Sequence, residues 1–263
     1  LTQSKNHITE TLPASILRKH ELVGKQHAMQ NIHFPKDNLA LASAQKRIKF
    51  DELFFIQLKL LRLKHVRHVS FRGQIFSDSS LLTTFYNTHL PFPLTDAQKK
   101  VIKEIYADMK SGKQMNRLLQ GDVGSGKTIV GFICMLLAIG SGAQCALMAP
   151  TEILAQQHYT NLKKHADAMH LPIALLTGST KKSDRKNIHE GLFDGNIKII
   201  VGTHALLEDP VQFKNLGLAV IDEQHRFGVA QRSKLWKKNE KVMPHVLVMT
   251  ATPIPRTLAM TLY

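Results

Sequence analysis

Two stretches of the chain hold residue types that could bind and split a nucleotide. The first, GDVGSGKT at residues 121–128, matches the pattern G-x-x-x-x-G-K-[ST] in full. Its members are Gly121, Asp122, Val123, Gly124, Ser125, Gly126, Lys127 and Thr128. Glycines permit a tight turn of phosphate-binding N–H groups, the lysine reaches the β- and γ-phosphates, and the threonine hydroxyl suits Mg²⁺. The pattern therefore predicts a phosphate-binding loop for ATP with Mg²⁺.

The second stretch places two acids at the end of an apolar run, LAVIDEQH at 218–225. Adjacent carboxylates repel each other, and a bound divalent cation relieves that repulsion. We expect Asp222 to hold Mg²⁺ through its water shell and Glu223 to orient and activate the attacking water. A solvated acidic turn would explain the pair equally well in isolation. The phosphate loop upstream favours the catalytic interpretation.

The residues after the two acids could couple hydrolysis to a movement. Gln224 and His225 can form hydrogen bonds to a part of the protein that shifts. The stretch VMTATPIPRT at 248–257 ends the next apolar run, and it offers the hydroxyls of Thr250 and Thr252. A bond from one of these hydroxyls to His225 is one hypothesis, and capping of the strand end is the alternative.

The elements that would position these residues alternate in type from about residue 95. Short apolar stretches predict strands at 117–120, 144–149, 173–177, 197–202, 218–222 and 245–251. Amphipathic stretches between them predict helices at 152–165, 183–193 and 226–238, and a further helix follows the phosphate loop. This α/β pattern predicts a parallel sheet with helices on both faces. Ligands bind beyond the carboxyl ends of such strands, where both motifs stand.

Residues 1–90 lack this alternation and are expected to be mainly helical. A long run of good helix formers without Pro or Gly follows Asp37 and Asn38, either of which suits an N-cap. Shorter helices are expected within 12–22 and 24–34. We therefore divide the chain into a helical segment, 1–90, and an α/β domain, 91–263.

The overall composition indicates the class of binding partner and the cellular compartment. A net charge of +15 favours a polyanion such as DNA, and residues 1–75 carry about half of the excess. Two cysteines outside a CxxC pattern suit a reducing compartment, and the 14 histidines show no zinc-binding spacing. No apolar run reaches the roughly 20 residues that span a bilayer. The first residue is Leu, so we expect a piece of a longer protein.

Together the motifs resemble those of a known enzyme family. The phosphate loop, DEQH at 222–225 and TAT at 250–252 resemble the motor motifs of superfamily-two helicases. The fuller strings resemble the RecG branch-migrating DNA helicases: APTEILAQQH (149–158), VGTHALL (201–207), DEQHRFGVAQR (222–232) and TATPIPRT (250–257). IHFP (32–35) and RIKFDELFFIQL (47–58) resemble the segment that joins that family's DNA-binding wedge domain to its motor. The resemblance implies that 91–263 is the first RecA-like motor domain.

The resemblance also implies roles for individual positions. Gln98 would read adenine, and Arg226 and Phe227 would belong to a family-specific extension whose role we do not derive. The segments facing the DNA backbone would contain Pro150, Thr151, Glu152, Thr203 and His204. The residues coupling hydrolysis to movement would be Thr250, Ala251 and Thr252.

The resemblance implies an ATP-dependent DNA helicase of the bacterial cytoplasm that remodels branched DNA, namely stalled forks and Holliday junctions. Such a motor needs a second domain, whose arginine at the γ-phosphate contributes on the order of 10³–10⁵ in turnover, so this chain alone should hydrolyse ATP weakly. Two alternatives stay open. One is the motor of a transcription-repair coupling translocase, and the other is a non-hydrolysing nucleic-acid-binding module that relies on the basic N-terminal third.

Overall fold

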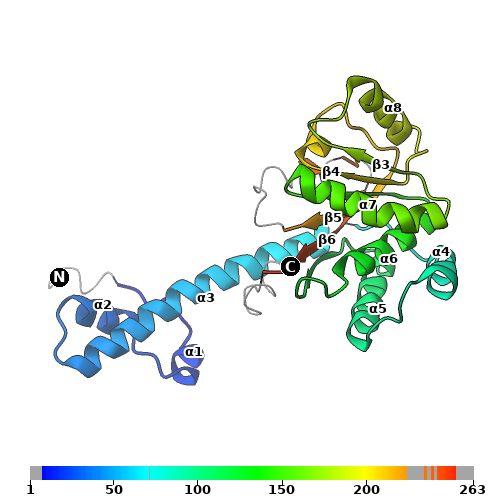
Figure 1. The fold of residues 1–263 in the computed structure, drawn as a ribbon. Helices are drawn as coiled ribbons and strands as arrows, with labels where there is room; N and C mark the ends of the chain where they lie inside the picture. The colour runs from blue at the N-terminus through cyan, green and yellow to red at the C-terminus, as the bar shows by residue number, and fades with distance from the viewer. Residues whose placement is uncertain (1–7, 71, 224–233, 236–237, 240–241, 253–263) are drawn as a thin grey trace. The chain divides into compact units, whose positions relative to one another are not determined.

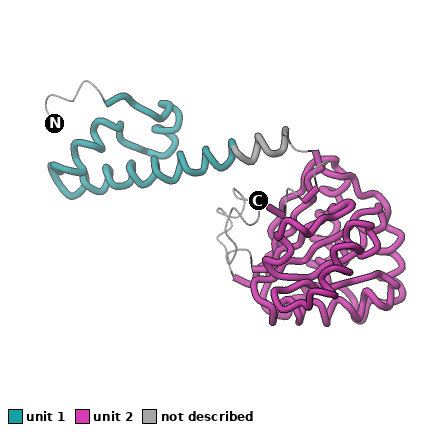
Figure 2. Tube along the Cα trace, turned by 90° about the horizontal axis from the view of Figure 1, so that it is seen from above, with its two compact units in different colours: residues 1–65 teal, residues 66–263 magenta. Residues whose placement is uncertain are grey.

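The computed structural model describes residues 8–70, 72–223, 234–235, 238–239 and 242–252. Contacts divide the chain into two units, residues 1–65 and 66–263, shown in teal and magenta in Figure 2. The expected domain division at residues 90 and 91 stays a prediction. The helix expected at 226–238 falls largely outside the described residues.

The first unit is helical and has an ion-paired arginine at its centre. Its helices are α1 (Ala14–Lys19), α2 (Lys25–His33) and most of α3 (Asn38–Ser70). Asp37 caps α3, because its Oδ1 accepts the N–H of Ala40 at 2.7 Å. The Arg47 guanidinium is fully buried and donates to Glu10 at 2.5 Å and to Asp51 at 2.9 Å. This guanidinium lowers the pKa of Glu10 to about 2.

The described residues of the second unit form a sheet of six parallel strands in the order β1-β6-β5-β2-β4-β3. In chain order they are β1 (Asn116–Gln120), β2 (Gln144–Met148), β3 (Ile173–Leu176), β4 (Ile199–Gly202), β5 (Leu216–Asp222) and β6 (His245–Thr250). All six coincide with the apolar stretches that predicted strands. The expected parallel α/β fold with a preceding helical segment is confirmed.

Helices cover both faces of this sheet. They are α4 (Ser80–Thr84), the π-helical turn η2 (Phe85–His89), α5 (Asp96–Lys110), α6 (Lys127–Gly140), α7 (Glu152–Ala168), α8 (Lys182–Phe193) and the 3₁₀ turn η3 (His204–Leu207). Side chains of α5, α6 and α7 pack in the core on one face, and those of α8 and η3 pack on the other (Figure 1). Strand residues alternate between the faces: Leu218 and Val220 join the first core, and Ala219 and Ile221 join the second.

The chain just before residue 90 contributes to the core of the α/β unit. Phe76 and Phe85 are fully buried there. The ring of His245, at the start of β6, lies between two backbone segments. Its Nδ1 accepts the N–H of Met115 at 2.9 Å, so its Nε2 carries the proton and donates to the carbonyl of Gln74 at 2.6 Å. This neutral histidine thus ties residues 72–76 to the sheet.

No helix among the described residues is long and apolar enough to cross a membrane.

Candidate nucleotide and nucleic-acid site

The phosphate loop joins β1 to α6, as the motif predicted. Gly124 and Gly126 adopt φ values of +79° and +80°, a region that favours glycine. Gly126 is the N-cap of α6, so the first N–H groups of this buried helix have no partner within it. These groups and the helix dipole make the loop a suitable anion site.

Two polar side chains bind the loop itself. The Lys127 ammonium donates to the carbonyl oxygens of Gly121 at 2.6 Å and Asp122 at 2.7 Å. The Gln98 side chain donates from Nε2 to the Ser125 carbonyl at 2.9 Å, and its Oε1 accepts the N–H of the helix cap before α5 at 2.9 Å. The structure therefore brings Gln98 to the phosphate loop, and its contact with adenine stays a prediction.

The two acids stand at the end of β5, beside the end of β6. Glu223 has a φ of +50°, unusual for a residue with a side chain. Its Oε2 accepts the hydroxyl of Thr250 at 2.9 Å, and its Oε1 accepts the N–H of Ala251 at 3.0 Å. The N–H of Thr252 donates to the Thr250 hydroxyl at 3.1 Å. The motif at 250–252 thus orients the carboxylate expected to act as base.

The expected link from a threonine hydroxyl to His225 is not described. Gln224, His225, Arg226 and Phe227 lie outside the described residues. The hydroxyl of Thr250 reaches the neighbouring acid, Glu223. This contact follows from the register of the sheet, which pairs Asp222 with Met249 and so sets Glu223 beside the end of β6.

Sequence reasoning missed a contact to the other acid. Nε2 of His158, on α7, lies 2.7 Å from Oδ2 of Asp222. Both side chains are 13% exposed. Because a carboxylate accepts hydrogen bonds, Nε2 carries the proton and donates it. The string at 149–158 ends on this histidine, but no motif rule assigned it a partner.

The oxygen atoms of Thr128 and Asp222 are suitable ligands for Mg²⁺. Hydroxyl and carboxylate oxygens are hard donors, and Mg²⁺ in nucleotide sites keeps several waters and binds phosphate oxygens. No three His, Cys, Asp or Glu side chains of the described residues gather into a self-sufficient metal site. Thr128 begins α6 and Asp222 ends β5, and their oxygen atoms fit a cation that shares its ligands with a nucleotide.

The segments expected to face DNA lie beyond the ends of β2 and β4. Pro150 precedes α7, and the hydroxyl of Thr151 caps that helix by accepting the N–H of Leu154 at 3.3 Å. Thr203 is buried, with a hydroxyl that has no partner among the described residues, and His204 is exposed. Hydroxyls and helix starts at one edge are suitable phosphate ligands.

A turn after β3 joins this edge, and sequence reasoning did not assign it. The Glu152 carboxylate accepts the hydroxyl of Ser179 at 2.8 Å and the N–H of Ser179 at 3.2 Å. These bonds hold the pKa of Glu152 below its usual range. The exposed Lys181 and Lys182 follow the turn directly. The charge of the lysines was visible in the sequence, but the contact of Ser179 with α7 was not.

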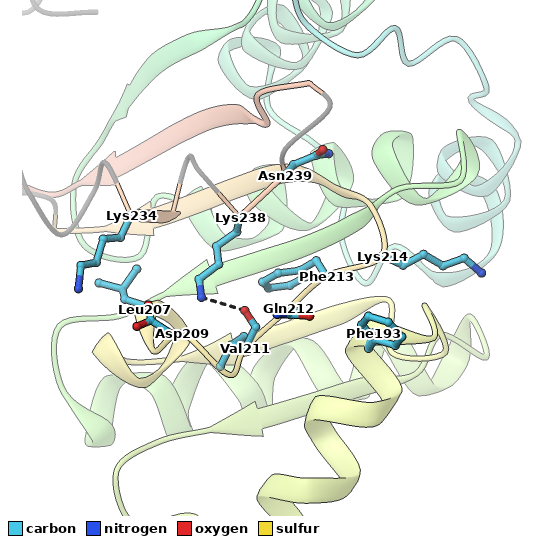
Figure 3. A pocket seen from close by; sticks show the side chains of 10 residues that line it. All are labelled: Phe193, Leu207, Asp209, Val211, Gln212, Phe213, Lys214, Lys234, Lys238 and Asn239. Carbon is cyan, nitrogen blue, oxygen red and sulfur yellow. Dashed lines mark hydrogen bonds between the residues drawn. The ribbon is translucent and has the colours of Figure 1, made fainter.

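A cavity of about 520 Å³ lies apart from both motifs (Figure 3). Its lining includes Phe193, Phe213 and Lys238, and none of the predicted site residues. Lys238 donates to the carbonyl of Val211 at 2.8 Å, and burial lowers the pKa of this lysine. The ammonium group of Lys238 is therefore already bonded within the protein.

The motifs and the fold have close counterparts among known proteins. The DEAD/DEAH box helicase family model matches residues 95–261. The ATP-dependent DNA helicase RecG of Synechocystis sp. is 49% identical over 256 residues, which cover 97% of this chain and 31% of that protein. RecG of Bacillus subtilis is 46% identical over 265 residues, covering 100% of this chain and 38% of that protein.

The similarity in structure, like the similarity in sequence, extends over nearly the whole chain. A solved structure of RecG bound to a three-way DNA junction matches with a TM-score of 0.80 at 42% identity, covering 98% of this chain and 34% of that one. The chain thus spans about a third of the length of the curated relatives it matches.

Proposed function

The chain belongs to the DEAD/DEAH box helicase family, and we propose that it is the nucleotide-binding motor segment of a RecG-type ATP-dependent DNA helicase. The similarity to RecG proteins over nearly the whole chain confirms the resemblance drawn from the motifs. The observation that carries the proposal is the joint placement of Lys127, Asp222 and Glu223 at the carboxyl edge of one parallel sheet.

ATP binding would exchange internal contacts of the loop for contacts to phosphate. The Lys127 ammonium now donates to two carbonyl oxygens of its own loop. The β- and γ-phosphates would draw it away, because an anionic phosphate oxygen attracts the ammonium more strongly than a neutral carbonyl oxygen does. Thr128 and, through water, Asp222 would hold Mg²⁺, which neutralises phosphate charge in such sites. Gln98 would contact adenine from its place beside the loop.

Glu223 would orient the attacking water and accept its proton. Thr250 and Ala251 each donate to one of its carboxylate oxygens, so a shift of 250–252 would turn the carboxylate. This link supports the coupling role proposed for these residues. Gln224 and His225, next in the chain, would extend the coupling.

DNA would bind by its backbone along the edge formed by 150–152 and 203–204. The Ser179 turn lies beside the first of these segments, and the exposed Lys181 and Lys182 follow it in the chain. Lys and Arg supply the bulk of phosphate affinity. The relative bound to a three-way junction supports branched DNA, such as stalled forks and Holliday junctions, as the substrate of the whole protein. We place the protein in the bacterial cytoplasm, where its two buried cysteines would stay reduced.

The 263-residue chain alone would bind ATP and hydrolyse it weakly. In helicases of this kind a second motor domain supplies an arginine to the γ-phosphate, and such arginines contribute on the order of 10³–10⁵ in turnover. The relatives are roughly three times longer than the matched segment, which is room for that domain and for a DNA-binding wedge.

A fluorescent ATP analogue titrated into the chain with Mg²⁺ tests the proposal. We expect saturable binding that Lys127→Ala weakens at least tenfold, with phosphate release near background in both proteins. Lys127→Arg, which keeps the charge, should retain more affinity than Lys127→Ala. Equal affinity of the chain and Lys127→Ala would contradict the proposal.

A further inference from the structure

His158 is the one residue in hydrogen-bond contact with Asp222 among the described side chains, and no motif accounts for it. The contact joins residues 64 positions apart in the chain. It is short, at 2.7 Å, and both side chains are largely shielded from water. A charge-assisted bond of this length in a shielded place has a defined geometry.

The helix α7 presents His158 to the sheet. Ala155, Leu162 and Ala166 are the buried residues of α7, and they recur at helical spacing. His158 stands three residues after Ala155 and four before Leu162, so it shares their face. Packing of that face against the sheet thus fixes the place of the imidazole over the end of β5.

The bond leaves one oxygen of Asp222 for the cation. His158 binds Oδ2, and among the described residues nothing donates to Oδ1. The terminal torsion of an aspartate is soft, so an untethered carboxylate would rotate. Partners behind a metal-binding carboxylate remove that freedom and typically change metal affinity about 10–100-fold.

We propose that His158 is a positioning residue that holds Asp222 with Oδ1 directed to the water shell of the nucleotide-bound Mg²⁺. The inference rests on the proposed function, because it presumes that Asp222 serves the cation. It adds a residue outside the phosphate loop and the acidic motif to the nucleotide site.

Magnesium dependence of nucleotide binding tests the role of His158. A fluorescent ATP analogue is titrated into the chain without metal and over a range of Mg²⁺, for the unchanged chain and four variants. His158→Ala and His158→Asn remove the contact, His158→Gln keeps an N–H long enough to reach Asp222, and Gln157→Ala is an exposed neighbour on α7. Circular dichroism checks that each variant is folded.

We expect metal-free affinity to be equal in all of them, because the phosphate loop is unchanged. In His158→Ala and His158→Asn the Mg²⁺ concentration at half effect should rise by about 10–100-fold. His158→Gln should bring this Mg²⁺ concentration most of the way back to that of the unchanged chain. Gln157→Ala should have the same value as the unchanged chain. His158→Asn, similar in size to His, serves the comparison if the alanine variant does not fold.

An unaltered magnesium midpoint in folded His158→Ala or His158→Asn would overturn the inference, as would a glutamine variant no better than asparagine. The proposed function has a separate signature of failure. In that case the unchanged chain and Lys127→Ala would bind the analogue alike, with or without Mg²⁺.

Discussion

Three residues of the nucleotide site adopt backbone conformations that side chains disfavour. Gly124 and Gly126 in the phosphate loop have positive φ, and so has Glu223 beside it. A residue with a side chain pays about 1–2 kcal/mol for such a conformation. At Glu223 that strain is offset by hydrogen bonds from Thr250 and Ala251. The site therefore depends on a few residues whose replacements should have distinct effects.

The two glycines of the loop allow strain and contact to be separated. At both, alanine meets the same unfavourable φ, which should destabilise the chain by about 1–2 kcal/mol. A Cβ at Gly126 would also displace the amide nitrogen of Gln98 and so break its bond to the Ser125 carbonyl, whereas a Cβ at Gly124 meets nothing within 4 Å. We therefore expect Gly126→Ala to lose more stability in urea unfolding, and more affinity for an ATP analogue, than Gly124→Ala. Equal losses would show that the contact with Gln98 does not matter.

The hydroxyl of Thr250 should affect catalysis more than binding. Thr250→Val keeps the shape of the side chain but removes the donor to Oε2 of Glu223. In a full-length protein carrying this segment we expect kcat for ATP to fall by about 10–100-fold, part of the 10²–10⁴ that a positioned base contributes. KM should hold, because Thr250 acts through Glu223. Thr250→Ser retains the donor and should keep most of the activity; a valine variant with normal kcat would refute the orienting role.

The elements of the α/β unit could be predicted because each motif follows a strand. Short apolar runs and the glycine loop locate β1, β5 and β6 in the chain, and the parallel pattern puts their ends at one edge. Pattern does not reveal register. The pairing of Asp222 with Met249 sets Glu223 beside Thr250, and the packing of α7 sets His158 on Asp222. The sequence placed the threonine hydroxyls near the acidic motif but did not indicate Glu223 as the partner, and it held no signal for the contact of His158 with Asp222.

The stability of the helical unit depends on the ion pairs of Arg47, on α3. Arg47 on α3 is buried with donors to Glu10, Asp51 and the carbonyl of Val23, and Glu10 also accepts the N–H of Lys25 at the start of α2. Glu10→Gln would leave buried donors short of an acceptor. We expect it to lower the stability of residues 1–65 by about 1–3 kcal/mol in urea unfolding of the chain. Glu52→Gln, an exposed neighbour on α3, should change it little, and equal effects would refute the prediction.

Over the whole molecule, the two units should differ in their response to acid. The pKa of Glu10 is lowered from 4.5 to about 2, so its contribution is full above pH 4.5 and disappears as the pH falls toward 2. In the α/β unit burial lowers the pKa of His165, His189 and His245 from the ordinary 6.5. The unfolded chain takes up these protons first, so stability is full above pH 6.5 and falls below it. Between pH 6.5 and 4.5 acid should therefore weaken the α/β unit while the helical unit keeps its ion pair.

His245 offers a direct test of that difference. Each histidine that stays neutral in the folded state should lower the free energy of unfolding by up to about 1.4 kcal/mol per pH unit below 6.5. His245→Gln can still accept from Met115 and donate to Gln74, but it does not titrate. Its urea midpoint for the α/β unit should fall less steeply between pH 7.5 and 5.5 than that of the unchanged chain. Parallel slopes would mean that His245 is not the titrating group, since the amide has no group that titrates in this range.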